Sequence, residues 1–229
     1  YTGGNSNGNL NNLKDKKVAI IGTGATAVQC VPHLAAGAKK LYVFQRTPSS
    51  IDERNNSNTD IDWFNAQKSG WQKERKENFE GFLTGNFTDK DLVNDGWTEI
   101  FRTILGGLIK NGPSKLVLLS WVLTAPFYKN FYKVGLRTYI RNKFMNFVTR
   151  EDINKKVEIV DFQKMEKVRA RADALVNNPK TAESLKPYYR QLCKRPCFHD
   201  EYLQAFNNDN VELIDTDGQG VKELSAEGI

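Results

Sequence analysis

The sequence predicts an α/β fold in which a parallel sheet is divided by a large, mostly helical insertion. Three observations predict it. An apolar run at residues 16–21 ends at a glycine motif, a helical pattern and a second apolar run at residues 41–45 follow it, and another strand-like run lies far along the chain at residues 211–215. Two strands joined by a helical crossover run parallel. Of the 229 residues 39% are hydrophobic, which is enough for a packed core.

The first strand–helix–strand unit is the best defined part of the pattern. Residues 16–21 (Lys-Lys-Val-Ala-Ile-Ile) are a short apolar run bounded by charge and glycine, which is typical of a buried strand. The helix that follows has apolar residues at helical spacing: Val28, Val31, Leu34 and Ala35. We expect this helix to be kinked at Pro32 and to end at Gly37. Residues 41–45 (Leu-Tyr-Val-Phe-Gln) form the second strand.

The middle of the chain predicts helices rather than strands. Residues 101–150 contain nine Lys and Arg and no acid. One predicted helix face there is apolar (Leu136, Ile140, Phe144 and Phe147), and another is basic (Lys129, Lys133, Arg137 and Arg141). We interpret the basic face as solvated. The alternatives are that it meets a membrane surface, a nucleic acid or an acidic face of another domain, although no recognised nucleic-acid motif accompanies it. We expect residues 1–50 and 156–229 to be two halves of one domain, with residues 51–155 as the helical insertion.

A further helix is predicted in the second half of that domain. Asp161 is a good N-cap, and an apolar face follows it (Phe162, Met165, Val168 and Ala172). We expect the helix to end at residues 177–179 (Asn-Asn-Pro). A short helical stretch at residues 200–206 then precedes the strand at residues 211–215.

The glycine motif gives the first indication of function. Residues 22–27 (Gly-Thr-Gly-Ala-Thr-Ala) directly follow a strand and open a helix. In this context Gly22 permits the tight turn, Gly24 lets the backbone approach a pyrophosphate at the helix N-terminus, and Ala27 lets helix and strand pack closely. The unit therefore predicts a Rossmann-like dinucleotide-binding domain. A tight turn without a ligand is the alternative.

The end of the second strand indicates which dinucleotide binds. A protein that binds NAD places Asp or Glu there for the ribose 2′-hydroxyl. This chain has Gln45, Arg46 and Thr47 instead. A guanidinium matches a 2′-phosphate through paired, charge-assisted hydrogen bonds, and the threonine hydroxyl adds a donor. The sequence thus favours NADPH over NADH, with a solvated surface arginine as the alternative.

The remaining composition excludes several classes of protein. Cys30, Cys193 and Cys197 are too few for a disulfide framework and indicate a reducing compartment. His199 alone lies near the last two cysteines, so we expect no metal site. No apolar run approaches about 18–20 residues, which excludes a spanning helix. No signal segment is visible, and we expect a cytoplasmic protein. The chain starts at Tyr1 rather than Met, and we interpret it as a piece of a longer protein.

Four segments together resemble the Baeyer–Villiger monooxygenases, especially their fungal-type members. They are residues 22–34, residues 44–48 (Phe-Gln-Arg-Thr-Pro), residues 70–75 and residues 193–202, which begin Cys-Lys-Arg-Pro. The likeness spans essentially the whole chain and keeps the order of the segments. It implies a flavoprotein in which NADPH reduces FAD and one oxygen atom of O2 is inserted beside a ketone. This chain resembles the NADPH-binding domain of such an enzyme with its helical insertion.

The resemblance also implies roles for individual residues. The pyrophosphate region is held by residues of the first turn: Gly22, Thr23, Gly24, Ala25, Thr26, Ala27 and Gln29. Arg46, Thr47 and Lys194 contact the 2′-phosphate. Arg195 matches the active-site arginine, which stabilises a negatively charged flavin intermediate and positions the nicotinamide. From the pattern alone, Lys194 and Arg195 would be an ordinary basic pair on the surface.

The segments that would bind FAD are absent from this sequence. The resemblance therefore implies that the chain is inactive alone and that an FAD domain is its intramolecular partner, with an apolar surface exposed where that domain docks. The expected substrates are a small ketone and O2. Two alternatives stay open: a flavin-containing monooxygenase that oxidises sulfides or amines such as N,N-dimethylaniline, and a stand-alone NADP-binding module without oxygenation.

Overall fold

The computed structural model describes residues 10–84, 88, 90–110, 150–226 and 228. The chain forms two compact units, one made of Tyr1–Ile61 with Lys164–Ile229 and the other of Asp62–Gln163. The first unit contains the parallel sheet, and the second unit interrupts it in the sequence. The α/β fold with a parallel sheet and a large helical insertion is thus confirmed. The helix faces predicted between Lys129 and Phe147 lie outside the described residues.

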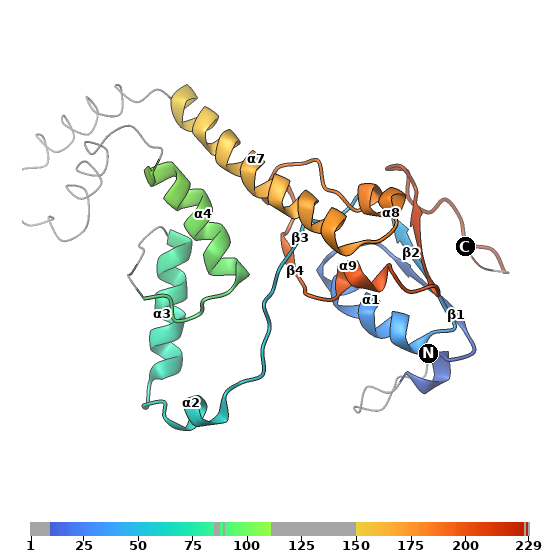
Figure 1. Ribbon diagram of the computed structural model, residues 1–229, viewed down its shortest axis with the longest axis horizontal. Coiled ribbons are helices and arrows are strands. Elements are labelled where there is room, and N and C mark those ends of the chain that lie inside the picture. The colour runs from blue at the N-terminus through green and yellow to red at the C-terminus, as the bar shows by residue number, and fades with distance from the viewer. Residues whose placement is uncertain (1–9, 85–87, 89, 111–149, 227, 229) are drawn as a thin grey trace, which may run out of the picture. The chain divides into compact units, whose positions relative to one another are not determined.

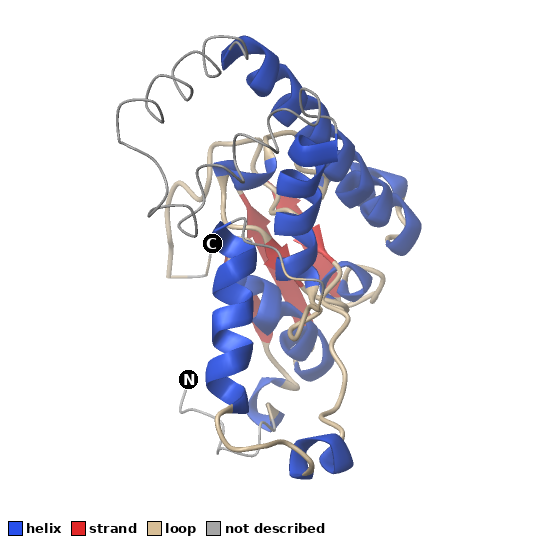
Figure 2. Cartoon of the chain, turned by 90° about the vertical axis from the view of Figure 1, so that its left-hand side faces the viewer, coloured by secondary structure: helices blue, strands red, loops and turns tan. Residues whose placement is uncertain are grey.

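The main sheet has three strands in the order β1-β2-β5. They are β1 (Lys17–Ile21), β2 (Lys40–Gln45) and β5 (Val211–Asp215), close to the three predicted strands. All three run parallel, with Ile21 opposite Phe44 at the carboxyl ends of β1 and β2. Figure 2 shows the strands in red. This register places the residues that follow β1 beside those that follow β2.

Helix α1 (Ala25–Gly37) provides the crossover from β1 to β2 and packs beside α9 (Tyr202–Ala205), as Figure 1 shows. The core joins these helices to one face of β2. Its fully buried members include Val28, Val31, Leu41, Val43, Tyr202 and Leu203. Burying one such side chain contributes about 1.5–3 kcal/mol. Apolar burial on this face therefore fixes the position of the glycine turn, since the turn joins β1 to α1.

Helix α7 (Arg150–Leu175) corrects the prediction for this part of the chain. The helix begins eleven residues before Asp161, which therefore is not its N-cap. No Gly or Pro lies between Arg150 and Asp161, so nothing in the sequence ends the helix there. Met165, Val168 and Ala172 are buried as predicted, whereas Phe162 is 60% exposed. The prediction for Phe162 is wrong because the buried face of the helix continues from Val168 through Lys164 to Val160, which leaves Phe162 outside it.

Short elements complete the first unit. The sequence did not predict β3 (Ile51–Asp52) and β4 (Cys197–Phe198), which pair in parallel. The Nζ atom of Lys164 lies 2.5 Å from the Asp52 carboxylate, and the Lys164 side chain is only 3% exposed. The smaller helical elements are η1 (Asn11–Leu13), α8 (Pro179–Ser184) and η3 (Gln191–Cys193). The buried ion pair therefore fastens α7 to β3 of the small sheet, whose other strand, β4, follows the Lys194–Arg195 segment.

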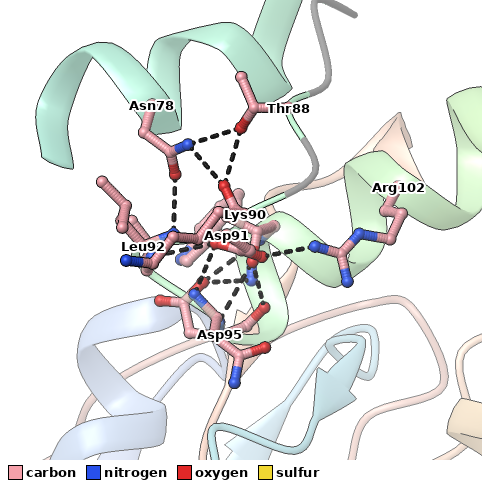
Figure 3. Close-up of polar contacts among 11 residues, drawn as sticks. Asn78, Thr88, Lys90, Asp91, Leu92, Asp95 and Arg102 are labelled. Carbon is pink, nitrogen blue, oxygen red and sulfur yellow. Dashed lines mark hydrogen bonds and ion pairs between the residues drawn. The ribbon is translucent and has the colours of Figure 1, made fainter. Parts of the chain in front are cut away.

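The helical part of the chain contains α2 (Ile61–Asn65), α3 (Trp71–Thr84) and α4 (Gly96–Lys110). They lie within residues 51–155, which the sequence predicted to be a helical insertion. The loop between α3 and α4 is held by two side chains, Asn78 and Asp91 (Figure 3). Asn78 accepts the Leu92 N–H at 2.9 Å and donates to the Lys90 carbonyl and the Thr88 hydroxyl at 2.8 Å each.

Asp91 is the second anchor of this loop. Its carboxylate accepts the backbone N–H groups of Val93 and Asn94 at 3.0 and 2.7 Å. It also accepts a hydrogen bond from the Arg102 guanidinium at 2.9 Å, and its side chain is only 6% exposed (Figure 3). The charge of Arg102 is therefore paired within the fold.

No helix in the described part of the chain is both long and apolar enough to cross a membrane. The compartment in which the protein works stays a prediction.

Candidate functional site

The glycine turn joins β1 to α1 and leaves the N-terminus of that helix open. Gly22 has φ +99°, a conformation that favours glycine, and its N–H donates to the Phe44 carbonyl at 2.8 Å. Among the described residues, no atom lies within 4 Å of where a Cβ would stand on Gly22 or Gly24. No side chain caps α1, and its first turn contains no acid. The unpaired N–H groups there can receive an anion.

Thr23 has a more structural role than the sequence predicted. Its side chain is buried, and its hydroxyl donates to the Thr47 carbonyl at 2.9 Å. The Ser49 hydroxyl in turn donates to the Thr23 carbonyl. The glycine turn is therefore fastened to the loop that follows β2. Any contact of Thr23 with a bound phosphate has to come from its backbone N–H, because its hydroxyl already faces Thr47.

The exposed residues of the first turn of α1 surround this opening. Ala25 and Thr26 are exposed, while Ala27 is buried where α1 meets the sheet. Gln29 is exposed, and its side-chain amide donates to the Ala25 carbonyl at 3.0 Å. Ala27 thus has the packing role that the motif predicts for its third small residue.

Arg46 follows directly after β2 and is exposed. Its Cδ lies 3.8 Å from where a Cβ would stand on Gly220, so its stem runs along the turn that follows β5. Thr216 fixes that turn, because its N–H and its hydroxyl both donate to the Gln45 carbonyl at 2.8 Å. The guanidinium is thereby carried at the carboxyl end of the sheet, the same end as the glycine turn.

Lys194 lies near Arg46 although 148 positions separate them in the sequence. Its Nζ atom lies 5.0 Å from the centre of the Tyr189 ring. Partial burial, and after it the positive charge of Arg46, hold the pKa of Lys194 below its ordinary value. In the described part of the chain no carboxylate pairs with either cation. Two like charges therefore act on each other, and neither has a counterion among the described residues.

Arg195 is exposed and follows Lys194 in the segment between η3 and β4. Its carbonyl accepts a weak hydrogen bond from the Cys197 thiol at 3.7 Å. Within the described residues its guanidinium has neither a hydrogen bond nor an ion pair. The fold thus leaves the side chain of Arg195 available, and its placement toward a substrate stays a prediction.

Two residues of the site were not predicted from the sequence. Tyr189 contacts the Lys194 ammonium through its ring, and Ser49 ties the loop after β2 to the glycine turn. Neither shows a local signal, because a tyrosine next to another tyrosine and a serine next to a proline are both common on surfaces. Only the contact across the fold distinguishes them.

Other chemistry receives no support from the described residues. A pocket of about 560 Å3 lies among Arg171, Asp200 and Gln204, and none of the predicted site residues lines it. The Asp200 carboxylate there accepts backbone N–H groups of the loop after β3, which accounts for its position. No cluster of three or more His, Cys, Asp or Glu side chains in the described ranges could hold a metal ion.

Comparison with known proteins identifies relatives of the whole chain. It is 50% identical over 229 residues to a Baeyer–Villiger monooxygenase of Stachybotrys chlorohalonatus, covering 100% of this chain and 32% of that protein. It is 45% identical over 225 residues to neopentalenolactone D synthase of Streptomyces avermitilis, covering 98% of this chain and 32% of the relative. The chain therefore spans about a third of the length of the relatives it matches. No family model matches the chain.

Solved structures agree with these relatives. The polycyclic ketone monooxygenase of the fungus Thermothelomyces thermophila has a TM-score of 0.68 and 39% sequence identity, and the match covers 95% of this chain and 31% of that one. A complex of OTEMO with FAD and NADP matches with a TM-score of 0.56 over 97% of this chain and 36% of that one; at 23% identity it shows the fold alone. The resemblance that the sequence motifs indicated is confirmed.

Proposed function

We propose that this chain, which is homologous over its whole length to a segment of Baeyer–Villiger monooxygenases, binds the NADPH of such an enzyme. One observation carries the proposal: the positive charge of Arg46, at the carboxyl end of the sheet, acts on Lys194, and no carboxylate among the described residues pairs with either cation. The 2′-phosphate is the group that distinguishes NADP from NAD, and it is an anion that two cations can share.

The pyrophosphate would bind at the start of α1. The open space in front of Gly22 and Gly24 fits a close approach of the phosphates to the backbone. The absence of a side-chain cap and of acids in the first turn of α1 leaves the N–H groups and the helix dipole available to the phosphates. The residues in this role are Gly22, Thr23, Gly24, Ala25, Thr26, Ala27 and Gln29.

The adenosine end would bind between the loop after β2 and the segment after η3. Arg46 and Lys194 would contact the 2′-phosphate, with Thr47 at the same loop. The pKa of Lys194 is lowered by burial and by Arg46, which means that the charged form is disfavoured without a ligand. A phosphate between the two cations would offset that repulsion. Phosphate binding would then favour the charged form of Lys194, and the charged form would in turn strengthen phosphate binding.

Arg195 would act at the nicotinamide end. A guanidinium stays charged and can hold negative charge that develops near the nicotinamide and the flavin. Bound NADPH would supply a hydride to FAD, and the reduced flavin would supply the electrons for the reaction with O2. FAD would be held mostly by segments outside this chain. The complete enzyme would insert one oxygen atom of O2 into a ketone and give an ester or a lactone.

The test uses the full-length protein that contains this chain. It should bind NADP+ at least about tenfold more tightly than NAD+, because charge-assisted hydrogen bonds contribute about 1.5–3 kcal/mol. With NADPH and a cyclic ketone it should give a lactone, detected by gas chromatography. Arg195→Ala should lower the rate of lactone formation by at least about a hundredfold and keep NADP+ binding. Equal affinity for the two dinucleotides, or full lactone formation by Arg195→Ala, would contradict the proposal.

A further inference from the structure

We propose that Tyr189 is a positioning residue that holds the Lys194 ammonium beside Arg46 and thereby sets the preference of the site for NADP over NAD. The inference rests on the proposed function and adds a residue to it that neither the glycine motif nor the Cys-Lys-Arg-Pro segment indicates. Tyr189 would touch Lys194 and not the dinucleotide.

The first observation is the contact between the lysine and the ring. The Lys194 ammonium lies 5.0 Å from the centre of the Tyr189 ring, within the range in which the ring quadrupole attracts a cation. A lysine side chain has four rotatable bonds, so without a contact its ammonium would occupy many positions. The ring therefore restricts where the charge lies before any ligand binds.

The second observation is that the ring itself is held rigidly. The Tyr189 hydroxyl accepts the backbone N–H of Ser50 at 2.9 Å, and Ser50 is fully buried. The Ser50 carbonyl accepts the Cys197 N–H at 2.9 Å, and its hydroxyl donates to the Gln191 side chain at 3.3 Å. Burial raises the pKa of Tyr189, so the phenol stays neutral at physiological pH.

The third observation connects this ring to the rest of the site. Ser50 lies four residues after Arg46 in the same loop, and the neighbouring Ser49 hydroxyl donates to the Thr23 carbonyl in the glycine turn. Tyr189 is thus attached to the loop that carries Arg46. Arg46 repels Lys194, and the attraction of the Tyr189 ring opposes that repulsion. Without the ring the ammonium would move away from Arg46 and from a shared phosphate.

The adjacent residue provides a matched control. The ring of Tyr188 also lies near a cation, with the Arg169 guanidinium carbon 5.1 Å from its centre. Its hydroxyl donates to Glu183 at 2.6 Å, and the side chain is 70% exposed. Tyr188 therefore has the same kind of cation contact one position away, but its hydroxyl is not bonded to Ser50.

The experiment measures the dissociation constants of NADP+ and NAD+ with the full-length protein and its variants. Tyr189→Leu should lower the preference for NADP+ about threefold or more, through weaker NADP+ binding alone. Tyr189→Phe, which keeps the ring, should retain most of the preference, and Tyr188→Leu should retain all of it. Tyr189→Met, which is flexible and lacks the ring, repeats the test if the leucine variant does not fold.

Lys194→Ala separates this inference from the proposed function. If that variant keeps the full preference for NADP+, the proposed role of Lys194 is wrong. If it lowers the preference while Tyr189→Leu and Tyr189→Met do not, the inference about Tyr189 is overturned and the proposed function stands. An equal loss of NADP+ and NAD+ binding in the Tyr189 variants would show a merely structural role and would also overturn it. In the Lys194→Ala background, Tyr189→Leu should have no further effect on the preference.

Discussion

The cations beside the glycine turn and the cation beside the α3–α4 loop have different surroundings. Arg102 donates to the Asp91 carboxylate at 2.9 Å, so its charge is balanced within the fold. Arg46 and Lys194 lie near each other, and the described ranges contain no carboxylate paired with either. Like charges held together weaken a fold unless something outside it balances them. The difference separates charges that stabilise the chain from charges available to an anionic ligand.

The ion pairs within the fold differ in how deeply they are buried. The largest expected effect on stability therefore comes from the most buried lysine, Lys164. Lys164 is 3% exposed and lies 2.5 Å from the Asp52 carboxylate, which is 14% exposed. Lys164→Ala should lower the free energy of unfolding by about 3–5 kcal/mol, because it leaves a buried carboxylate without its partner. Urea unfolding followed by circular dichroism measures the change.

Lys73→Ala is the control for that prediction. Lys73 pairs with Glu77 one helical turn away at 3.8 Å, and both side chains are more than half exposed. Its replacement should change the free energy of unfolding by about 0.5 kcal/mol or less. If the Lys73 and Lys164 variants lost equal stability, burial would not be what distinguishes structural charges in this protein.

Arg46→Ala and Arg102→Ala test the comparison directly. Arg46→Ala should weaken NADP+ binding about tenfold or more, leave NAD+ binding unchanged and change stability by less than about 0.5 kcal/mol. Arg102→Ala should do the reverse: it should cost about 1–2 kcal/mol of stability, because the carboxylate of Asp91 loses a charged partner, and leave NADP+ binding unchanged. Titrations with the two dinucleotides and urea unfolding measure both effects. If Arg46→Ala lost stability and kept the preference for NADP+, Arg46 would be a structural charge like Arg102 and not a ligand-binding one.

The sequence predicted the parts of the fold that depend on local patterns. The strands β1, β2 and β5 and the turn at Gly22 appear close to their expected positions, because apolar runs and a glycine at positive φ are local requirements. The strands β3 and β4 were missed. Each has two residues, and each is defined only by its pairing with the other across more than 140 residues.

The candidate site was predictable in part for the same reason. Arg46 follows a strand in sequence, so its place at the end of the sheet could be inferred. Lys194 was indicated only by the family resemblance, since no local pattern brings it to Arg46. The buried hydroxyl of Thr23 and the ring of Tyr189 act through contacts between distant segments. Such contacts depend on how the whole first unit packs, and the spacing of apolar residues along the sequence does not predict that packing.

The smallest expected effect is the pH dependence of stability that comes from Asp91, the carboxylate paired with Arg102. Burial alone would raise the pKa of Asp91, but hydrogen bonds from Thr98, Asn94 and Val93, together with the charge of Arg102, outweigh it and hold that pKa below its ordinary value. The unfolded chain therefore binds this proton more readily than the folded chain. The stabilisation is present above pH about 4 and is lost as the pH falls through the lower, folded pKa.

Asp91→Asn should remove this pH dependence. At pH 7 the variant should be about 1 kcal/mol less stable than the wild type, because it keeps acceptors for the loop N–H groups but loses the charge opposite Arg102. Toward pH 3 the two proteins should converge, since the wild-type carboxyl becomes neutral too. Urea unfolding at a series of pH values measures the difference, with Asp209→Asn at an exposed position as the control. A difference that stays constant down to pH 3 would mean that Asp91 stabilises the loop by shape rather than by charge. The charge of Arg102 would then add little to the stability of the loop, and the hydrogen bonds of the buried Asp91 side chain would account for the contrast between the two regions.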